Sequence, residues 1–271
     1  MPKATLGVIG GGVMGAALMS RLLDQGIFSP ESILVSDPQT SRREFLQHTY
    51  GVKTTANNQL VAEAATVMLL AVKPQALATV ATSLSAAALS SESPLLLSIL
   101  AGVPLARLTE QFPGWVVVRA MPNTPATVGA GMTALAAGTD ITPAQLEQAR
   151  QIFTSVGEVV EVPESLMDAV TALSGSGPGY IALVIEALAD GGVAAGLPRA
   201  IAMQLALQTV KGTAELLQHT GLHPGALKDQ VTSPGGTTIA GVAQLEAAGL
   251  RSALMSAVGA AHRRAGELGQ L

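Results

Sequence analysis

A glycine-rich segment near the start of the chain, Gly10-Gly11-Gly12-Val13-Met14-Gly15, limits the folds open to this sequence more than any other feature. It follows the apolar run Thr5–Ile9 and opens a helix-length segment, Val13–Gln25. In a G-x-G-x-x-G pattern so placed, the first glycine permits a tight turn, the second lets the backbone approach a pyrophosphate, and the third lets helix and strand pack closely. Free N–H groups at the helix N-terminus complete an anion site. The segment predicts a Rossmann-like domain whose cofactor contacts include Gly10, Gly12 and Gly15, and a plain glycine-rich turn is the weaker alternative.

Apolar runs of strand length alternate with helix-length segments as far as Val162, and several runs are apolar throughout, as is typical of strands covered on both faces. The predicted strands are Thr5–Ile9, Ile33–Ser36, Val67–Val72, Leu95–Ser98, Val116–Ala120, Met132–Ala136 and Glu158–Val162. The predicted helices are Val13–Gln25, Ser41–Thr49, Gln75–Ser85, Leu105–Gln111 and Pro143–Thr154, the last with Thr142 as N-cap and Gln145 completing a capping box. This alternation predicts a parallel sheet with right-handed crossovers.

After Pro163 the pattern changes, because helix-length segments take over. They are Leu166–Leu173, Pro178–Ala195, Pro198–Leu217, Pro224–Val231, Thr238–Ala248 and Leu250–Leu268. Gly191-Gly192 inside the second of these is costly for a helix and predicts a kink or the close approach of another backbone. We therefore expect an α/β fold class, with a Rossmann-like dinucleotide-binding domain at 1–163 and an all-α domain at 164–271.

The amino-acid composition excludes several classes of protein. The chain has 271 residues, of which 48% are hydrophobic and 13% charged, and its net charge is −4. An average globular chain carries about 25% charged residues. High hydrophobicity excludes a disordered chain, and the acidic balance argues against a nucleic-acid partner. We expect neither a membrane span nor a signal peptide, and thus a cytoplasmic protein, because the uncharged stretches are broken by glycine, proline and polar residues. Without cysteine or a cluster of ligating side chains, no metal site is predicted.

The end of the second predicted strand bears on cofactor choice. Asp37 lies where an NAD enzyme places the acid that binds the ribose hydroxyls. Arg42 and Arg43 follow within reach of a 2′-phosphate, although they can also be solvated residues on the next helix. The choice between NAD and NADP therefore stays open at this point.

Two further loops follow predicted strands, where ligands of open parallel sheets bind. Ala71-Val72-Lys73-Pro74 carries Lys73, which can meet a cofactor phosphate or ribose or can be an ordinary surface lysine. The loop Arg119–Pro125 holds Asn123 between two prolines, where the nicotinamide should end. Asn123 as a simple turn former is the equal alternative.

In the helical half, Thr232-Ser233-Pro234-Gly235-Gly236-Thr237-Thr238 opens a helix, so its N–H groups can form an anion pocket sized for a carboxylate. Ser174-Gly175-Ser176-Gly177-Pro178 is interpreted as a break at which Pro178 restarts a helix. The four histidines are scattered and are expected at the surface.

Taken in order along nearly the whole chain, these segments resemble the pyrroline-5-carboxylate reductase family. The resemblance rests on the glycine loop, Ala71–Pro74, Arg119-x-Met121-Pro122-Asn123, Ser174–Pro178, Asp190–Val193, Gly196–Arg199 and Val231–Thr238. Its most specific part is Ser-Pro-Gly-Gly-x-Thr at 233–238. One departure is Gly179, where the family usually has alanine.

The resemblance implies NAD(P)H-dependent reduction of the cyclic imine 1-pyrroline-5-carboxylate to L-proline, the last step of proline synthesis. NADPH is the expected cofactor, with NADH possible in principle. The substrate residues it implies are Glu164, Ser233, Gly236, Thr237 and Thr238, with the Thr238 hydroxyl, the catalytic group, near the ring nitrogen. Asn123 is added to the predicted substrate residues from its place in the loop described above. The cofactor residues it adds are Val13, Met14, Ser36, Asn58 and Ala71, Val72, Lys73 and Pro74, beside Asp37. It also implies a homodimer at minimum, with a ring of dimers left open.

Two other functions are compatible with a dinucleotide-binding domain followed by helices. Dehydrogenases of the 3-hydroxyacid type need a lysine four residues after the last glycine of a Gly-x-Gly turn, where this chain has Ile181. A non-catalytic dinucleotide sensor would have no need of the intact Ser233–Thr238 segment. Both are disfavoured.

The charge deficit is concentrated in one segment. From Ala169 to Val210 the charged residues are Glu186, Asp190 and Arg199 alone. This predicts a helical subunit interface built with alanine and glycine for close packing.

Overall fold

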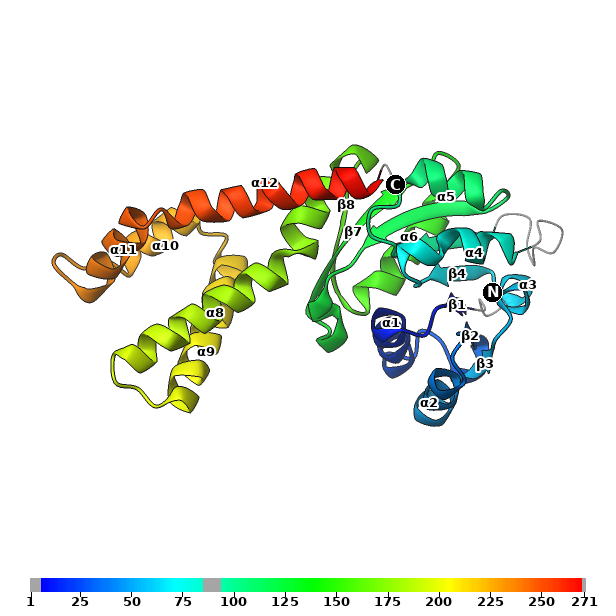
Figure 1. The fold of residues 1–271 in the computed structure, drawn as a ribbon, viewed down its shortest axis with the longest axis horizontal. Helices are drawn as coiled ribbons and strands as arrows, with labels where there is room; N and C mark the ends of the chain where they lie inside the picture. Colours follow the sequence, from blue (N-terminus) through cyan, green and yellow to red (C-terminus); the bar gives the residue numbers. More distant parts are fainter. Residues whose placement is uncertain (1–5, 85–93, 270–271) are drawn as a thin grey trace. The chain divides into compact units, whose positions relative to one another are not determined.

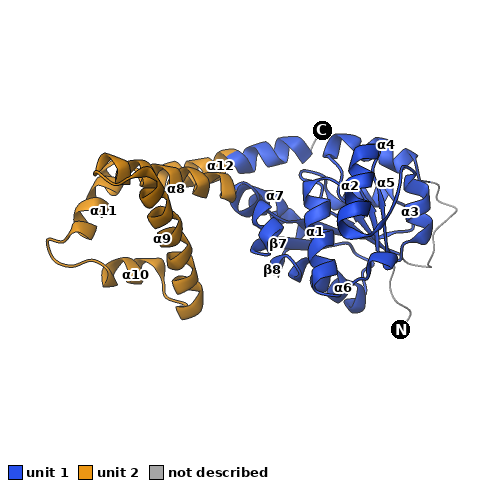
Figure 2. Ribbon diagram, turned by 90° about the horizontal axis from the view of Figure 1, so that it is seen from below, with its two compact units in different colours: residues 1–176, 261–271 blue, residues 177–260 orange. Residues whose placement is uncertain are grey.

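The computed structural model describes residues 6–84 and 94–269, so Thr5 and Ser85, which end two predicted elements, lie outside the described residues. The chain forms two compact units, shown in Figure 2. Unit 1 comprises residues 1–176 and 261–271, and unit 2 comprises residues 177–260. The domain boundary predicted between residues 163 and 164 stays a prediction. In the structure, contacts between residues place the segment 164–176 in the same compact unit as the sheet.

Unit 1 is built on an eight-stranded sheet in the order β3-β2-β1-β4-β5-β6-β7-β8 (Figure 1). The strands are β1 (Leu6–Ile9), β2 (Ile33–Ser36), β3 (Lys53–Thr55), β4 (Val67–Leu70), β5 (Leu95–Ser98), β6 (Val116–Met121), β7 (Gly131–Ala137) and β8 (Gly157–Glu161). All neighbours from β3 to β6 pair in parallel, as predicted.

The prediction of a wholly parallel sheet is wrong at β7, which pairs antiparallel with β6. The connection, residues 122–130, contains only a 3₁₀ turn at Thr124–Val128. A parallel crossover needs a dozen or more residues, so this short connection can only return the chain antiparallel. β8 then pairs in parallel with β7 after a helical crossover.

Helices cover both faces of the sheet, and each face has its own core. On one face the buried side chains of α1, α2 and α6 meet those of the strands. On the other face α3, α4 and α5 do the same. The helices of unit 1 are α1 (Val13–Asp24), α2 (Thr40–Tyr50), α3 (Asn58–Ala64), α4 (Leu77–Thr82), α5 (Leu105–Gln111), α6 (Pro143–Thr154) and α7 (Met167–Val170). The capping box of Thr142 and Gln145 at the start of α6 is confirmed.

Two elements were not predicted, the strand β3 and the helix α3. β3 is a three-residue edge strand with the polar sequence Lys-Thr-Thr, so it carries no hydrophobic pattern. α3 begins with Asn58 and Gln59 and buries only Val61 and Ala62, so its sequence shows little of a helical period.

Unit 2 is helical, as predicted. Its helices are α8 (Gly177–Ala194), α9 (Arg199–Thr220), α10 (Pro224–Gln230), α11 (Thr237–Ala247) and α12 (Leu250–Gly269), whose last turns belong to unit 1. α8 and α9 pack through buried Ala189, Ala202 and Ala206. A Cβ on Gly192 would lie 3.1 Å from the Ala202 Cβ. The absence of a side chain at Gly192 therefore lets α9 pack close to α8, in line with the predicted close approach of another backbone.

Gly157 provides a test of the β7–β8 pairing. Its φ of +146° disfavours any side chain, and a Cβ there would lie 2.5 Å from the Gly131 backbone nitrogen. Gly157→Ala is expected to lower the free energy of unfolding by at least about 3 kcal/mol, because strain and a backbone clash add. Urea unfolding followed by circular dichroism measures the change.

The matched control is Gly26→Ala. Gly26 also has a positive φ, +65°, but no atom in the described part of the chain lies within 4 Å of its added Cβ. Only the backbone term of about 1–2 kcal/mol should appear there. Equal losses in the two variants would contradict a steric role for Gly157.

Candidate functional site

Buried polar side chains gather at one edge of an otherwise apolar sheet. Ser36, Ser98 and Arg119 are each at most 3% exposed. They share one row across the strands, because the register pairs Ser36 with Ile9, Ile9 with Leu70, Leu70 with Ser98, and Ser98 with Arg119. Since this row ends β1, β2, β4 and β5, it marks the carboxyl edge, beyond which ligands of open parallel sheets bind.

The glycine loop follows β1 at this edge, and its three motif glycines have different surroundings. Gly10 has a φ of +100°, and a Cβ there would lie 2.6 Å from the carbonyl oxygen of Ala71. A Cβ on Gly15 would meet the carbonyl oxygen of Gly10. Among the described residues, no atom lies within 4 Å of a Cβ built on Gly12. Gly10 and Gly15 are therefore required by packing, whereas Gly12 leaves open space for a ligand.

The N-terminus of α1 faces that open space with backbone donors. Gly12 is the N-cap and makes no side-chain capping hydrogen bond, and the first helical bond runs from the Ala16 N–H to the Gly12 carbonyl at 2.9 Å. The N–H groups of the first turn, Val13 and Met14 among them, have no partner in their own helix. These donors and the space at Gly12 fit a pyrophosphate, so the residues present fit a dinucleotide.

Asp37, just beyond β2, is engaged by the backbone through both carboxylate oxygens. The Gly11 N–H donates to Oδ2 at 3.0 Å, and the Gln39 N–H donates to Oδ1 at 2.9 Å. Asp37 therefore fixes the glycine loop against β2, whether or not it also meets a ribose.

Two arginines lie at the end of β2, and one of them contacts the glycine loop. The Arg42 side chain donates to the carbonyl oxygens of Gly11 and Gly12 and lies 4.6 Å from the centre of the Phe45 ring. Arg43 donates from Nη1 to the carbonyl oxygen of Asp37 at 2.8 Å. These contacts place two guanidinium groups beside the end of β2.

The other predicted cofactor residues lie along the same edge. The Ser36 hydroxyl donates to Asn58 Oδ1 at 2.7 Å, and Asn58 Nδ2 donates to the Ser83 hydroxyl at 2.9 Å. Ala71–Pro74 follows β4, where the Ala71 N–H donates to the carbonyl of Ile9 at 2.8 Å and the Lys73 side chain is exposed. Ser83 was not predicted, because nothing in the sequence marks it.

Glu164 lies beside β6 and forms an ion pair with Arg119. From the sequence alone, no role in the site was predicted for Arg119. Arg119 Nη1 donates to Glu164 Oε1 at 2.7 Å, and the Leu105 N–H donates to the same oxygen at 3.0 Å. The Arg119 side chain is 4% exposed, and Asp168 Oδ1 lies 3.9 Å from its Nη2. A charged residue within an apolar strand run was the signal that could have singled out Arg119.

Asn123 uses both ends of its amide within unit 1. Its Oδ1 accepts from the Met132 N–H at 2.9 Å, and its Nδ2 donates to the Ser174 carbonyl at 3.1 Å. Its contact with substrate stays a prediction.

The predicted substrate loop forms the turn before α11 in unit 2. Gly235 has a φ of +67°, and the Gly236 N–H donates to the Ser233 carbonyl at 3.0 Å. Gly236 is the N-cap of α11 without a side-chain cap, so the N–H groups of Thr237 and Thr238 begin the helix. An eleven-residue helix that opens on free N–H groups suits a carboxylate.

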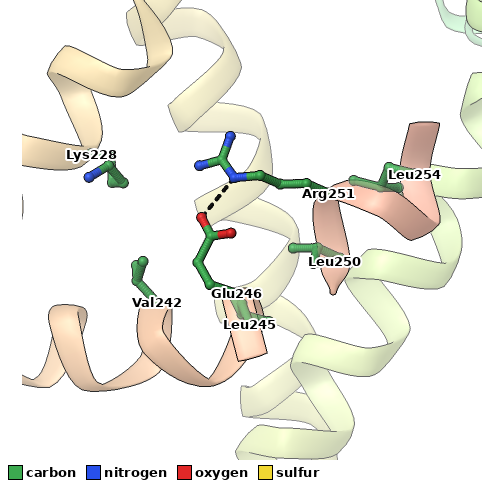
Figure 3. A pocket seen from close by; sticks show the side chains of 7 residues that line it. All are labelled: Lys228, Val242, Leu245, Glu246, Leu250, Arg251 and Leu254. Atoms are coloured by element: carbon green, nitrogen blue, oxygen red, sulfur yellow. Dashed lines mark hydrogen bonds and ion pairs between the residues drawn. The ribbon is translucent and has the colours of Figure 1, made fainter. Parts of the chain in front are cut away.

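A separate cavity of about 270 Å³ lies in unit 2 between α10, α11 and α12 (Figure 3). Arg251 Nε donates to Glu246 Oε1 at 2.7 Å within it. None of the predicted site residues lines this cavity. Among residues 6–84 and 94–269, no group of three or more histidine, aspartate or glutamate side chains could hold a metal ion.

The fold and the carboxyl edge define the class: an α/β dinucleotide-binding oxidoreductase with a helical second domain. A family model described as "NADP oxidoreductase coenzyme F420-dependent" matches residues 5–102, and one described as "Pyrroline-5-carboxylate reductase dimerisation" matches residues 164–268. The pyrroline-5-carboxylate reductase of Synechocystis is 60% identical over 98% of each chain.

Solved structures agree with the sequence comparison. A pyrroline-5-carboxylate reductase structure from Coxiella burnetii matches with a TM-score of 0.91 and 36% identity over 98% of each chain. The Plasmodium falciparum enzyme, solved with NADP bound, matches with a TM-score of 0.87 and 32% identity over 99% of each chain. The chain belongs to the pyrroline-5-carboxylate reductase family.

The different surroundings of Gly12 and Gly15 give a testable prediction. Gly12→Ala should bind NADPH at least about tenfold more weakly, because its methyl group fills the space left for the ligand. As a poorer N-cap it should lower the unfolding midpoint only slightly, whereas Gly15→Ala, which meets backbone, should lower it much more. Calorimetric titration with NADPH and thermal unfolding measure the two effects.

Gly212→Ala is the matched control, since it adds a methyl group within α9 that, among the described residues, meets the Gln208 side chain at 3.9 Å. It should leave NADPH affinity unchanged and slightly raise the unfolding midpoint, because alanine is favoured over glycine in a helix interior by about 1 kcal/mol. Wild-type affinity in Gly12→Ala would refute the assignment of this loop to the cofactor.

Proposed function

We propose that this protein reduces the cyclic imine 1-pyrroline-5-carboxylate to L-proline with NADPH. The observation that carries the proposal is the 60% identity over 98% of both chains to an enzyme of that name. It is supported by the polar carboxyl edge in unit 1 and by the helix-opening turn in unit 2.

The residues suit the chemistry of an imine. A protonated imine carries its own positive charge, so its carbon accepts a hydride without a strong general base. The bound nicotinamide cofactor supplies that hydride. The chain's part is to orient the reactants, an effect that can contribute about 7–11 kcal/mol in favourable cases.

The local structure at two helix N-termini supports the proposed binding roles, and the role of the Thr238 hydroxyl is taken from the family resemblance. The first turn of α1 binds the pyrophosphate through its N–H groups. The turn of Ser233 and Gly236 and the first N–H groups of α11, from Thr237 and Thr238, bind the substrate carboxylate, and the Thr238 hydroxyl contacts the ring nitrogen. No histidine is required, and all four histidines are exposed.

The arginines at the end of β2 favour NADPH over NADH in this proposal. The Asp37 carboxylate already accepts two backbone N–H groups. Arg42 and Arg43 provide two guanidinium groups nearby, and guanidinium is the group best suited to a phosphate. NADH, which lacks the 2′-phosphate, is expected to serve less well.

We further propose that the protein is a cytoplasmic homo-oligomer whose smallest unit is a dimer, and that its dimers can assemble into a ring. The helical stretch Glu164–Ala194 is long and apolar enough to cross a membrane by length and composition. In unit 2, however, apolar side chains are exposed on several helices, with Leu183 67% and Met255 75% exposed. Exposed apolar area on this scale marks an interaction surface, and we assign it to another copy of the chain.

Thr238→Ala tests the proposed function. Purified wild-type protein should oxidise NADPH when 1-pyrroline-5-carboxylate is added, and faster than NADH. Thr238→Ala should lower kcat by about tenfold or more, because a hydrogen bond to the reacting ring nitrogen is lost. Absorbance of the reduced nicotinamide follows the reaction.

Thr220→Ala is the control, because the Thr220 hydroxyl donates to its own helix, to the Leu216 carbonyl at 2.7 Å. It should leave kcat unchanged. The proposal fails if wild type oxidises neither cofactor with this substrate, and the role of Thr238 fails if its variant keeps wild-type kinetics.

A further inference from the structure

The helical stretch that follows β8 is irregular at one point, a π-helical turn at Thr171–Gly175. There the Ser176 N–H donates to the Thr171 carbonyl at 2.9 Å, one residue further back than in an α-helix. The sequence gives a reason. Pro178 has no N–H, and a proline ring clashes with the carbonyl four residues before it. That carbonyl belongs to Ser174, which therefore lacks its α-helical donor.

Asn123 supplies a donor to this carbonyl. Its Nδ2 lies 3.1 Å from the Ser174 oxygen, while its Oδ1 accepts from the Met132 N–H at 2.9 Å. Because one partner can only accept and the other can only donate, the orientation of the amide is set. The two segments are also in close contact, since a Cβ on Gly175 would lie 2.6 Å from the Met121 Cε.

The same strand holds the other end of this segment. Arg119, two residues before Met121 on β6, pairs with Glu164 at 2.7 Å. Between the two anchors Met167 is fully buried against alanines of β7. Residues 164–175 are thus attached to the carboxyl end of β6 at both ends, by Arg119 and by Asn123.

The π-helical turn and the loop after β6 lie at the edge to which we assign the cofactor. π-helical turns occur frequently at functional sites, because they redirect a helix locally. A single amide that joins the loop after β6, the start of β7 and this turn determines how all three face that edge.

We propose that Asn123 is a positioning residue for the imine reduction, and that its amide does this by capping the Ser174 carbonyl that Pro178 leaves without a helical donor. The proposal rests on the proposed function. It differs from a role as substrate ligand, because Asn123 acts through the backbone groups that it joins.

A double-mutant cycle tests it. Asn123→Asp keeps an acceptor for the Met132 N–H but loses the donor and sets a carboxylate oxygen against the Ser174 carbonyl. Pro178→Ala restores an N–H that can serve this carbonyl. Asn123→Asp should lower kcat by about tenfold in the wild-type background and by less than about threefold in the Pro178→Ala background. KM for the imine should stay within about twofold, and the unfolding midpoint should show the same coupling.

Thr127→Ala is the control in the same loop, because the Thr127 hydroxyl donates within the loop, to the Thr124 carbonyl at 2.9 Å. It should keep wild-type kinetics. Equal losses from Asn123→Asp in both backgrounds, or a loss carried by KM, would overturn the proposal in favour of direct substrate contact. If Asn123→Asp fails to fold in both backgrounds, Asn123→Ala runs the same cycle without the added charge. If the wild type has no imine reductase activity, the proposed function fails, and coupling of the unfolding midpoints still decides whether the cap exists.

Discussion

The parallel register of β2, β1, β4, β5 and β6 is the constraint on which the candidate site depends. It aligns the ends of these strands so that the glycine loop, Asp37 and Ala71–Pro74 emerge at one edge. A slip of one residue would turn every side chain of a strand to the opposite face. β1, β4 and β5 are buried along their whole length, and the two hydrophobic cores on the faces hold the register.

At the carboxyl end of β6, ion pairs of Arg119 with two carboxylates hold the structure together, in place of apolar side chains. A guanidinium as buried as that of Arg119 costs several kcal/mol unless carboxylates meet it. Glu164 and Asp168 do so from the segment that leads toward the helical half of the chain. The buried arginine therefore requires these two residues at the sheet, and Asn123 attaches the same segment one turn after α7.

Most of the fold could be predicted from the sequence, because the strands of the sheet are short apolar runs separated by helix-length segments. β3 was missed because an exposed edge strand of Lys-Thr-Thr shows no such run. The predicted direction of β7 was wrong because the alternation of strand-length and helix-length segments does not show which strands pair in parallel. The length of the connection 122–130 does, since it is too short for a parallel crossover.

The candidate site was less predictable than the fold. The glycine loop could be recognised from the spacing of its glycines within six residues. The hydrogen-bond partners of Asp37, Glu164 and Asn123 are distant in sequence and could not. Glu164 meets Arg119 and Asn123 meets Ser174 only after the chain has folded. Sequence patterns identify residue types suited to a ligand, but they do not show which polar atoms the fold itself uses.

Hydrogen exchange with and without NADPH tests the central claim, that the carboxyl edge of the sheet holds the cofactor. At a concentration ten times the Kd, NADPH should slow exchange by up to about tenfold for the amides of residues 11–14, 37, 39, 72 and 73. The amides of Glu31 and Thr66, near the amino ends of β2 and β4, should be unchanged. Protection confined to the amino ends, or none at the carboxyl ends despite saturation, would contradict the account.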